Sequence, residues 1–189
     1  MSQSSSPQPV TPTTLQLSKR GDVLLKLGAH GETRLLVSAA TMSEASSVFA
    51  AMFDGRFLEG QSSTTDAQRE VLLPDDDPES MTILCKIVHF QADDVLESVT
   101  LDALADFAIL CDKYDCIRAA APWGKLWVNE FLAVPITPST EKLILVTYLL
   151  DLPWQFRQTT KLLVQHRTAI DESVARHGLD FLPKKLFGT

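Results

Sequence analysis

The residue types that most often do chemistry are sparse in this 189-residue chain, and their densest group is a run of three aspartates. Asp75, Asp76 and Asp77 could together bind a divalent cation through their carboxylates. The run also stands between Pro74 and Pro78, where one aspartate can cap the next helix and the others can lie at its positive end. The spacing of a calcium loop and its distal glutamate are absent. We therefore interpret the run as helix capping and keep a metal site as the alternative.

The cysteines and histidines do not form a recognisable site either. Cys111 and Cys116 could be combined with His89 as metal ligands, but their spacing matches no zinc pattern and supplies no fourth ligand. We interpret these two cysteines and Cys85 as buried thiols in a compartment where cysteines stay reduced. The four histidines are scattered along the chain: His30, His89, His166 and His177.

The sequence carries no enzyme motif. It has no glycine-rich phosphate loop, no G-x-S-x-G and no H-E-x-x-H. We therefore predict a protein that is not an enzyme, with no catalytic residues, no metal and no cofactor. A metal-dependent hydrolase that uses the acidic run and the histidines is the remote alternative.

The elements that could position a site begin with a predicted hairpin and two short helices. An apolar run at residues 23–27, Gly28 and Gly31, and a second apolar run at residues 33–37 predict two strands joined by a tight turn. Ser38 can cap a first helix, and Ser46 or Ser47 can cap a second helix that contains Phe49, Met52 and Phe53. Because helices this short are unstable alone, we expect them to pack on the hairpin.

The rest of the chain is predicted to be mainly helical. A helix is expected from Pro78 onward, with Met81, Leu84, Cys85 and Val88 as its apolar stripe, and another from Thr100 or Asp102 to about Lys113. Beyond Cys116, prolines separate three further predicted helices at residues 119–131, 139–150 and 154–170, with Pro122 in the first turn of the earliest. Aromatic residues at helical spacing in this part are interpreted as core rather than as a binding surface: Trp123, Trp127, Tyr148, Trp154 and Phe156.

In this order and at these spacings, the elements resemble the BTB (POZ) domain, especially the divergent BTB proteins common in filamentous fungi. The resemblance covers residues 21 to about 116. It implies a third strand at residues 70–73, a helix at residues 81–89, and a helix at residues 101–114 in which ALADFAILCDKY is similar to the family's "LLxLADKY" helix. It rests on a succession of short motifs: Asp22-Val23, Leu35-x-Val37-Ser38, Met42, Ser46-x-Val48-Phe49 and Met52-Phe53.

The resemblance implies an α+β, mainly helical chain in three parts. Residues 19–116 are expected to form a BTB/POZ-like domain with a small sheet of three or more strands flanked by short helices. Before it, the Ser-, Thr-, Pro- and Gln-rich composition of the first residues predicts a disordered tail over residues 1–18. Residues 117–189 form a helical extension similar to those of other fungal BTB proteins.

The resemblance further implies a protein-interaction module, including a possible role as substrate adaptor for a cullin-based ubiquitin ligase. Such adaptors carry an apolar-x-Glu motif after the helix that ends in Met-Phe, and this chain has Phe57, Leu58 and Glu59 at that offset. The expected protein-binding residues are therefore Met52, Phe53, Phe57, Leu58 and Glu59. Alternatively, Phe57 packs beneath its own loop as an ordinary core residue.

One departure from the family pattern bears on self-association. Dimeric family members pair an aspartate at the position of Asp22 with a basic residue that is replaced here by Ala39. An unpaired buried carboxylate is strongly disfavoured, so we expect Asp22 to be solvated or to cap a helix. Homo- or hetero-oligomerisation in transcriptional or scaffold regulation is the alternative function, although strand exchange could use only Leu15 and Leu17 before Gly21.

Composition and charge argue against two classes of partner, nucleic acids and membranes. A net charge of −7 without a cluster of Lys and Arg argues against direct nucleic-acid binding. The sequence shows no signal peptide and no apolar stretch long enough to span a membrane. We therefore expect no membrane partner and a location in the cytoplasm, the nucleus or both.

Overall fold

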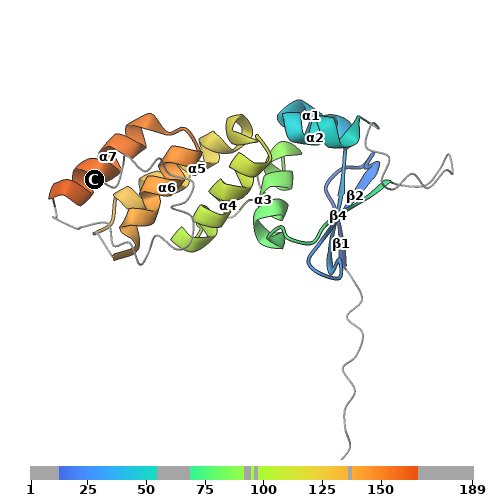
Figure 1. Ribbon diagram of the computed structural model, residues 1–189, viewed down its shortest axis with the longest axis horizontal. Helices are drawn as coiled ribbons and strands as arrows, with labels where there is room; N and C mark the ends of the chain where they lie inside the picture. Colours follow the sequence, from blue (N-terminus) through green and yellow to red (C-terminus); the bar gives the residue numbers. More distant parts are fainter. Residues whose placement is uncertain (1–12, 55–68, 92–94, 96–97, 136–137, 166–189) are drawn as a thin grey trace, which may run out of the picture.

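The protein has an α+β, mainly helical fold in the computed structural model, which describes residues 13–54, 69–91, 95, 98–135 and 138–165. A four-stranded sheet lies at one end, and the helices extend from it to the other end of an elongated body (Figure 1). The predicted fold class is therefore confirmed at this level. No helix in the described ranges is both long and apolar enough to cross a membrane.

The sheet has the strand order β1-β3-β2-β4. Strands β2 (Val23–Leu27) and β3 (Thr33–Val37) form an antiparallel hairpin with the predicted bounds, and β4 (Arg69–Leu73) pairs in parallel with β2. The two turn glycines, Gly28 and Gly31, have φ of 82° and 67°, which only glycine adopts without cost. Alternate residues of β2 and β3 face the helices, as the burial of Leu25, Leu27, Leu35 and Val37 shows.

The first strand corrects the prediction of a disordered tail over residues 1–18. β1 (Thr13–Gln16) lies at one edge of the sheet and pairs in parallel with β3, and Leu17 after it is buried, its N–H donating to the Leu36 carbonyl at 2.9 Å. A low apolar content misled the prediction, because strand pairing is made by backbone groups that every residue but proline supplies. Residues 1–12 lie outside the described ranges.

The two short helices form as predicted. Helix α1 (Ala39–Ala45) is capped by Ser38, whose hydroxyl accepts from the Thr41 N–H, and α2 (Ser47–Phe53) is capped by Ser46, which accepts from the Phe49 N–H at 2.9 Å. Each buries only one side chain completely, Met42 in α1 and Phe49 in α2.

Two longer helices connect the sheet to the rest of the molecule. Helix α3 (Pro78–Val88) begins at Pro78, as predicted, and Asp77 caps it by accepting from the Ser80 N–H at 2.7 Å. Helix α4 (Leu101–Lys113) is capped by Thr100. Both bury a continuous apolar stripe, as their residue spacing predicts.

Three helices and a 3-10 turn complete the fold: α5 (Ile117–Leu132), η2 (Pro138–Glu141), α6 (Lys142–Leu149) and α7 (Pro153–Gln165). The prediction that Pro122 lies in the first turn is wrong, since α5 begins at Ile117 and contains Pro122 in its interior. Pro122 therefore leaves the Arg118 carbonyl without its usual donor. The predicted last helix is described only to Gln165.

Three of these helices end in the same way. Phe90, Asp115 and Asp151 follow α3, α4 and α6 with φ of 60°, 50° and 50°, the left-handed conformation usually taken by glycine. The next residue in each case donates its N–H to a carbonyl in the last turn: Gln91 to Lys86, Cys116 to Cys111 and Leu152 to Thr147, at 2.8 to 2.9 Å. Each end is thus a Schellman motif built without glycine.

A single buried cluster runs from the sheet through α3 and α4 into α5, α6 and α7. Trp127 of α5 is 1% exposed and meets the ring of Phe107 edge-on at 5.5 Å, which confirms it as a core residue. The same prediction is wrong for Tyr148 and Trp154, which are 43% and 59% exposed. Helical spacing did not reveal that their faces of α6 and α7 point away from the cluster.

Candidate functional site

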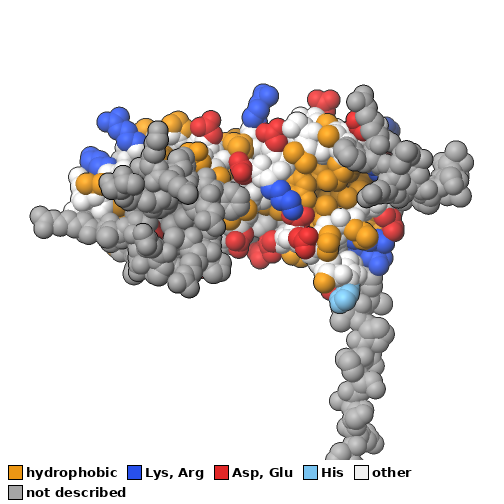
Figure 2. All heavy atoms as spheres, in the orientation of Figure 1, with side chains coloured by type: hydrophobic (Ala, Val, Ile, Leu, Met, Phe, Trp, Pro, Cys, Tyr) orange, Lys and Arg blue, Asp and Glu red, His pale blue; other side chains and the backbone are white. Residues whose placement is uncertain are grey.

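The end of helix α2 combines exposed apolar surface with unusually tight anchoring. Met52 and Phe53 occupy its last turn and are partly buried, whereas Phe49, one turn earlier, is fully buried. Phe49 stacks on Phe53 at 5.6 Å between ring centroids and on Tyr114, the residue that follows α4, at 4.5 Å. Figure 2 shows hydrophobic side chains gathered on the face beneath α1 and α2. Met52 and Phe53, which the sequence predicted as binding residues, are the last two residues of α2.

Arg69, the first residue of β4, holds the carboxyl end of α2. Its guanidinium donates to the carbonyls of Met52 and Phe53 at 2.8 and 3.0 Å and lies 5.7 Å from the centroid of the Phe53 ring. Helix α2 has no basic residue in its own last turn. Arg69 therefore supplies both the missing hydrogen-bond donors and the positive charge that favours a helix carboxyl end.

The amino end of α2 is tied to the loop after α4. The Ser46 hydroxyl donates to the Tyr114 carbonyl at 2.5 Å, and the Ser47 hydroxyl donates to Asp115 at 2.5 Å. Together with the Phe49–Tyr114 stack, these contacts fix α2 from a segment 68 residues further along the chain.

Tyr114 is fixed in turn by the middle aspartate of the acidic run. Asp76 is 7% exposed and accepts from the Tyr114 hydroxyl at 2.7 Å and from Lys113 at 2.6 Å. Burial, with the hydrogen bond to Asp76 and its negative charge, raises the pKa of Tyr114 above its usual range. The prediction that one aspartate of the run caps the next helix is confirmed, and that aspartate is Asp77, but the role of Asp76 was not predicted.

Asp22 and His89 both act at the start of α1. The Ala39 N–H donates to Asp22 Oδ1 at 2.7 Å, which confirms the expectation that Asp22 caps a helix. The Ser38 N–H donates to His89 Nε2 at 3.0 Å, and His89 Nδ1 lies 2.8 Å from the Cys85 carbonyl. Nδ1 must carry the proton, because Nε2 accepts and a carbonyl can only accept. Burial lowers the pKa of His89, which favours this neutral form.

The three cysteines are buried and free, as the sequence predicted. Burial raises the pKa of Cys85 and of Cys111 well above the usual value, and that of Cys116 to about 11, so all three are poor nucleophiles at neutral pH. Within the described ranges, no three His, Cys, Asp or Glu side chains converge to form a metal site.

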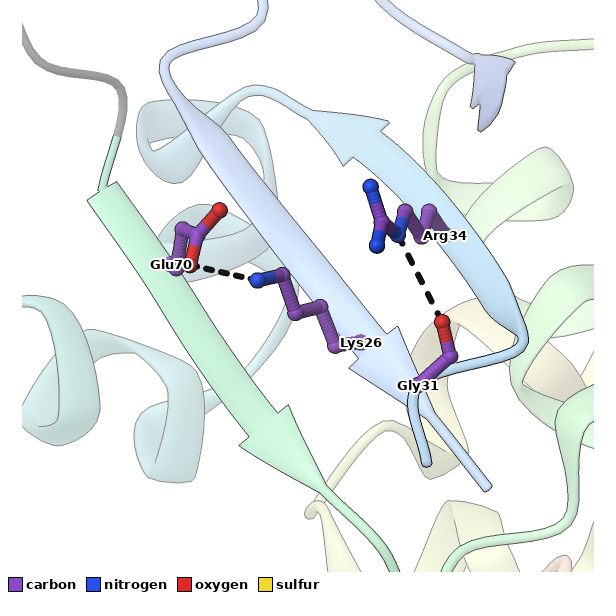
Figure 3. A network of polar contacts seen from close by, with 4 residues as sticks. All are labelled: Lys26, Gly31, Arg34 and Glu70. Carbon is purple, nitrogen blue, oxygen red and sulfur yellow. Dashed lines mark hydrogen bonds and ion pairs between the residues drawn. The ribbon is translucent and has the colours of Figure 1, made fainter. Parts of the chain in front are cut away.

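The outer face of the sheet carries charged side chains beside three leucines, Leu24, Leu36 and Leu72. Lys26 on β2 pairs with Glu70 on β4 at 2.5 Å, and Arg34 on β3 donates to the Gly31 carbonyl at 3.5 Å (Figure 3). Register places these residues on the face opposite Val23 and Arg69, and so on the side away from α2.

The remaining predicted binding residues, Phe57, Leu58 and Glu59, lie outside the described residues. Sequence reasoning missed Arg69, although one signal was available: α2 lacks a basic last turn, and an arginine begins the segment that becomes β4. No protein-family model matches the chain, and no curated protein matches its sequence significantly.

Proposed function

We propose that this chain is a BTB-type protein-interaction module whose partner surface includes the end of helix α2. The observation that carries the proposal is the state of Met52 and Phe53, which are partly exposed yet held on a helix anchored at both ends. A preorganised apolar surface loses little entropy on binding and so suits partner recognition. The proposal assigns no catalytic activity to the chain.

The arrangement of elements supports the BTB assignment. A hairpin followed directly by two short helices, a parallel third strand and two longer helices occurs in the order that the resemblance implies. Lys113 and Tyr114, which belong to the "LLxLADKY"-like segment, both donate to Asp76. These contacts fix the end of that segment to the start of α3.

The partner that the resemblance favours is a cullin scaffold. In this proposal Phe57 fills an apolar cleft of the cullin, with Met52, Phe53, Leu58 and Glu59 beside it. The module would then act as a substrate adaptor of a ubiquitin ligase.

The test is co-purification from a eukaryotic lysate, followed by direct binding measurements with the purified cullin. Wild type is compared with Phe57→Ala combined with Glu59→Ala, and with Trp154→Ala, which removes an aromatic that is 59% exposed on the distant helix α7. We expect the cullin with wild type and Trp154→Ala but not with the double variant. Failure to recover a cullin with wild type, or equal recovery with the double variant, contradicts the adaptor role.

Self-association is the second candidate, and strand β1 is the observation that favours it. β1 lies at the edge of the sheet, and its outer edge has no partner strand among the described residues. Such an edge can pair with another chain. Light scattering at high micromolar concentration tests this function, and a strict monomer would exclude it.

A further inference from the structure

We infer that Arg69 is the positioning residue of the partner surface, the side chain that fixes Met52 and Phe53 in the orientation a partner contacts. This inference rests on the proposed function. Arg69 itself need not contact the partner, because it acts through the last turn of α2.

The first step is that helix α2 does not provide hydrogen-bond donors for the carbonyls at its own carboxyl end. It has seven residues, fewer than an isolated helix needs, and the carbonyls of its last turn have no donors within the helix. Arg69 donates to two of these carbonyls, those of Met52 and Phe53, at 2.8 and 3.0 Å. These are the two residues whose side chains form the partly exposed surface.

The second step is that Arg69 also fixes a side chain directly. Its guanidinium lies 5.7 Å from the centroid of the Phe53 ring, a cation–π distance, while Phe49 stacks on the same ring at 5.6 Å. Phe53 therefore has contacts with both a planar cation and a buried ring.

The third step is that Arg69 is itself rigidly placed. Its N–H donates to the Asp22 carbonyl at 3.1 Å, and its Cα pairs with Val23 in the sheet. The Asp22 side chain caps α1 through Ala39 at 2.7 Å. Arg69 thus fixes the end of α2 relative to the sheet, and Asp22, its backbone partner, fixes the start of α1.

Arg69→Lys separates this role from charge alone. Lysine keeps the positive charge but loses the planar fork that serves two carbonyls and stacks on a ring. Arg34→Lys is the matched control, since Arg34 lies on the opposite face of the same sheet and makes a single 3.5 Å contact with Gly31. Arg69→Gln, which keeps one uncharged NH2 donor group, provides a second variant if the lysine variant does not fold.

Two readouts are taken at a temperature where circular dichroism shows all variants folded. Hydrogen exchange should quicken in a peptide covering residues 47–54 in Arg69→Lys, with no change over residues 142–149. Affinity for the purified cullin should fall about tenfold in Arg69→Lys and stay within about twofold in Arg34→Lys. A residue that only supports global stability would leave the affinity of the folded protein unchanged.

The outcomes separate the inference from the function on which it rests. If wild type binds the cullin and folded Arg69→Lys binds equally well, the positioning role is wrong and the proposed function stands. If wild type does not bind the cullin, the proposed function fails and the role of Arg69 in binding fails with it. In that case the exchange measurement still shows whether Arg69 holds the end of α2.

Discussion

Helices α2 and α6 are nearly equal in length, seven and eight residues, but they are held in opposite ways. Helix α6 buries six of its eight side chains and has no side-chain cap at its start. Helix α2 buries only Phe49 but is tied by side-chain hydrogen bonds to Tyr114, Asp115 and Arg69. Burial secures α6, whereas directional contacts secure α2.

The difference shows how a small protein can present apolar surface without losing order. Burial is not directional, so a helix held only by burial must hide its apolar side chains. Hydrogen bonds and ring stacking fix orientation and leave other side chains free to face outward. Met52 and Phe53 can therefore stay partly exposed, while nearly all apolar side chains of α6 are hidden.

The largest loss of stability should come from a substitution in the buried core around α6. Trp127→Ala, in α5 next to α6, should lower the free energy of unfolding by about 3–5 kcal/mol because it leaves a large cavity. Trp154→Ala is the same substitution at a side chain that is 59% exposed, and should change it by less than about 0.5 kcal/mol. Urea denaturation measures both. Similar losses would mean that α7 is packed differently from what its exposure indicates.

Asp76→Ala tests an indirect support of α2, because Asp76 holds Tyr114 and Tyr114 stacks on Phe49 of α2. Removing this buried carboxylate leaves the Tyr114 hydroxyl without its partner, and should lower the free energy of unfolding by about 2–3 kcal/mol. The value lies below that of a fully buried pair because the Lys113 side chain is 52% exposed. Glu70→Ala, which breaks the more exposed pair with Lys26, is the control and should cost less than about 1 kcal/mol. Equal costs would contradict a supporting role for Asp76.

Ser46→Ala tests the direct contact between the start of α2 and Tyr114. Ser46 both caps α2 and donates to the Tyr114 carbonyl, so its loss should lower the free energy of unfolding by about 1–2 kcal/mol. Ser38→Ala removes only a cap, the 3.3 Å contact with Thr41, and should cost less. Thermal melts of the two variants compare these losses. A larger loss at Ser38 would show that the link from α2 to α4 contributes little.

His89, which accepts from the Ser38 N–H at the start of α1, gives the stability of the protein a dependence on pH. Its pKa is lowered in the folded protein, so the unfolded chain binds the proton more readily. Stability should be complete above the unfolded pKa of about 6.5 and should fall as the pH drops below it. Urea midpoints between pH 7.5 and 5.5 measure this slope, which should be smaller in His89→Gln. The same slope in both proteins would assign it to other groups.

Local pattern predicted much of the fold, because hairpins and capped helices depend on near neighbours in sequence. The bounds of β2 and β3 and the caps at Ser38 and Ser46 follow from glycine placement and residue spacing. β1 was missed because its pairing is made by the backbone with a strand about 20 residues away. The exposure of Trp154 was missed because periodicity does not show which face of a helix meets the core.

The candidate site was predicted only in part, for the same reason. Met52 and Phe53 were identified through their place in a motif, and Asp22 through the absence of a basic partner. Arg69 and Asp76 act over 16 to 38 residues, so only the folded chain shows what they contact. Short-range roles can be inferred from the sequence, whereas contacts between distant segments require the structure.

The three helix ends without glycine have a consequence for how this protein can change. Phe90, Asp115 and Asp151 each occupy a conformation that favours glycine, and Phe90 is also 90% exposed. A single replacement by glycine at Phe90 or Asp151 would relieve backbone strain without altering a core contact, whereas at Asp115 it would remove the carboxylate that accepts from the Ser47 hydroxyl. The chain therefore holds a reserve of stability at its surface, which evolution or protein engineering could use to tolerate destabilising changes in the partner surface.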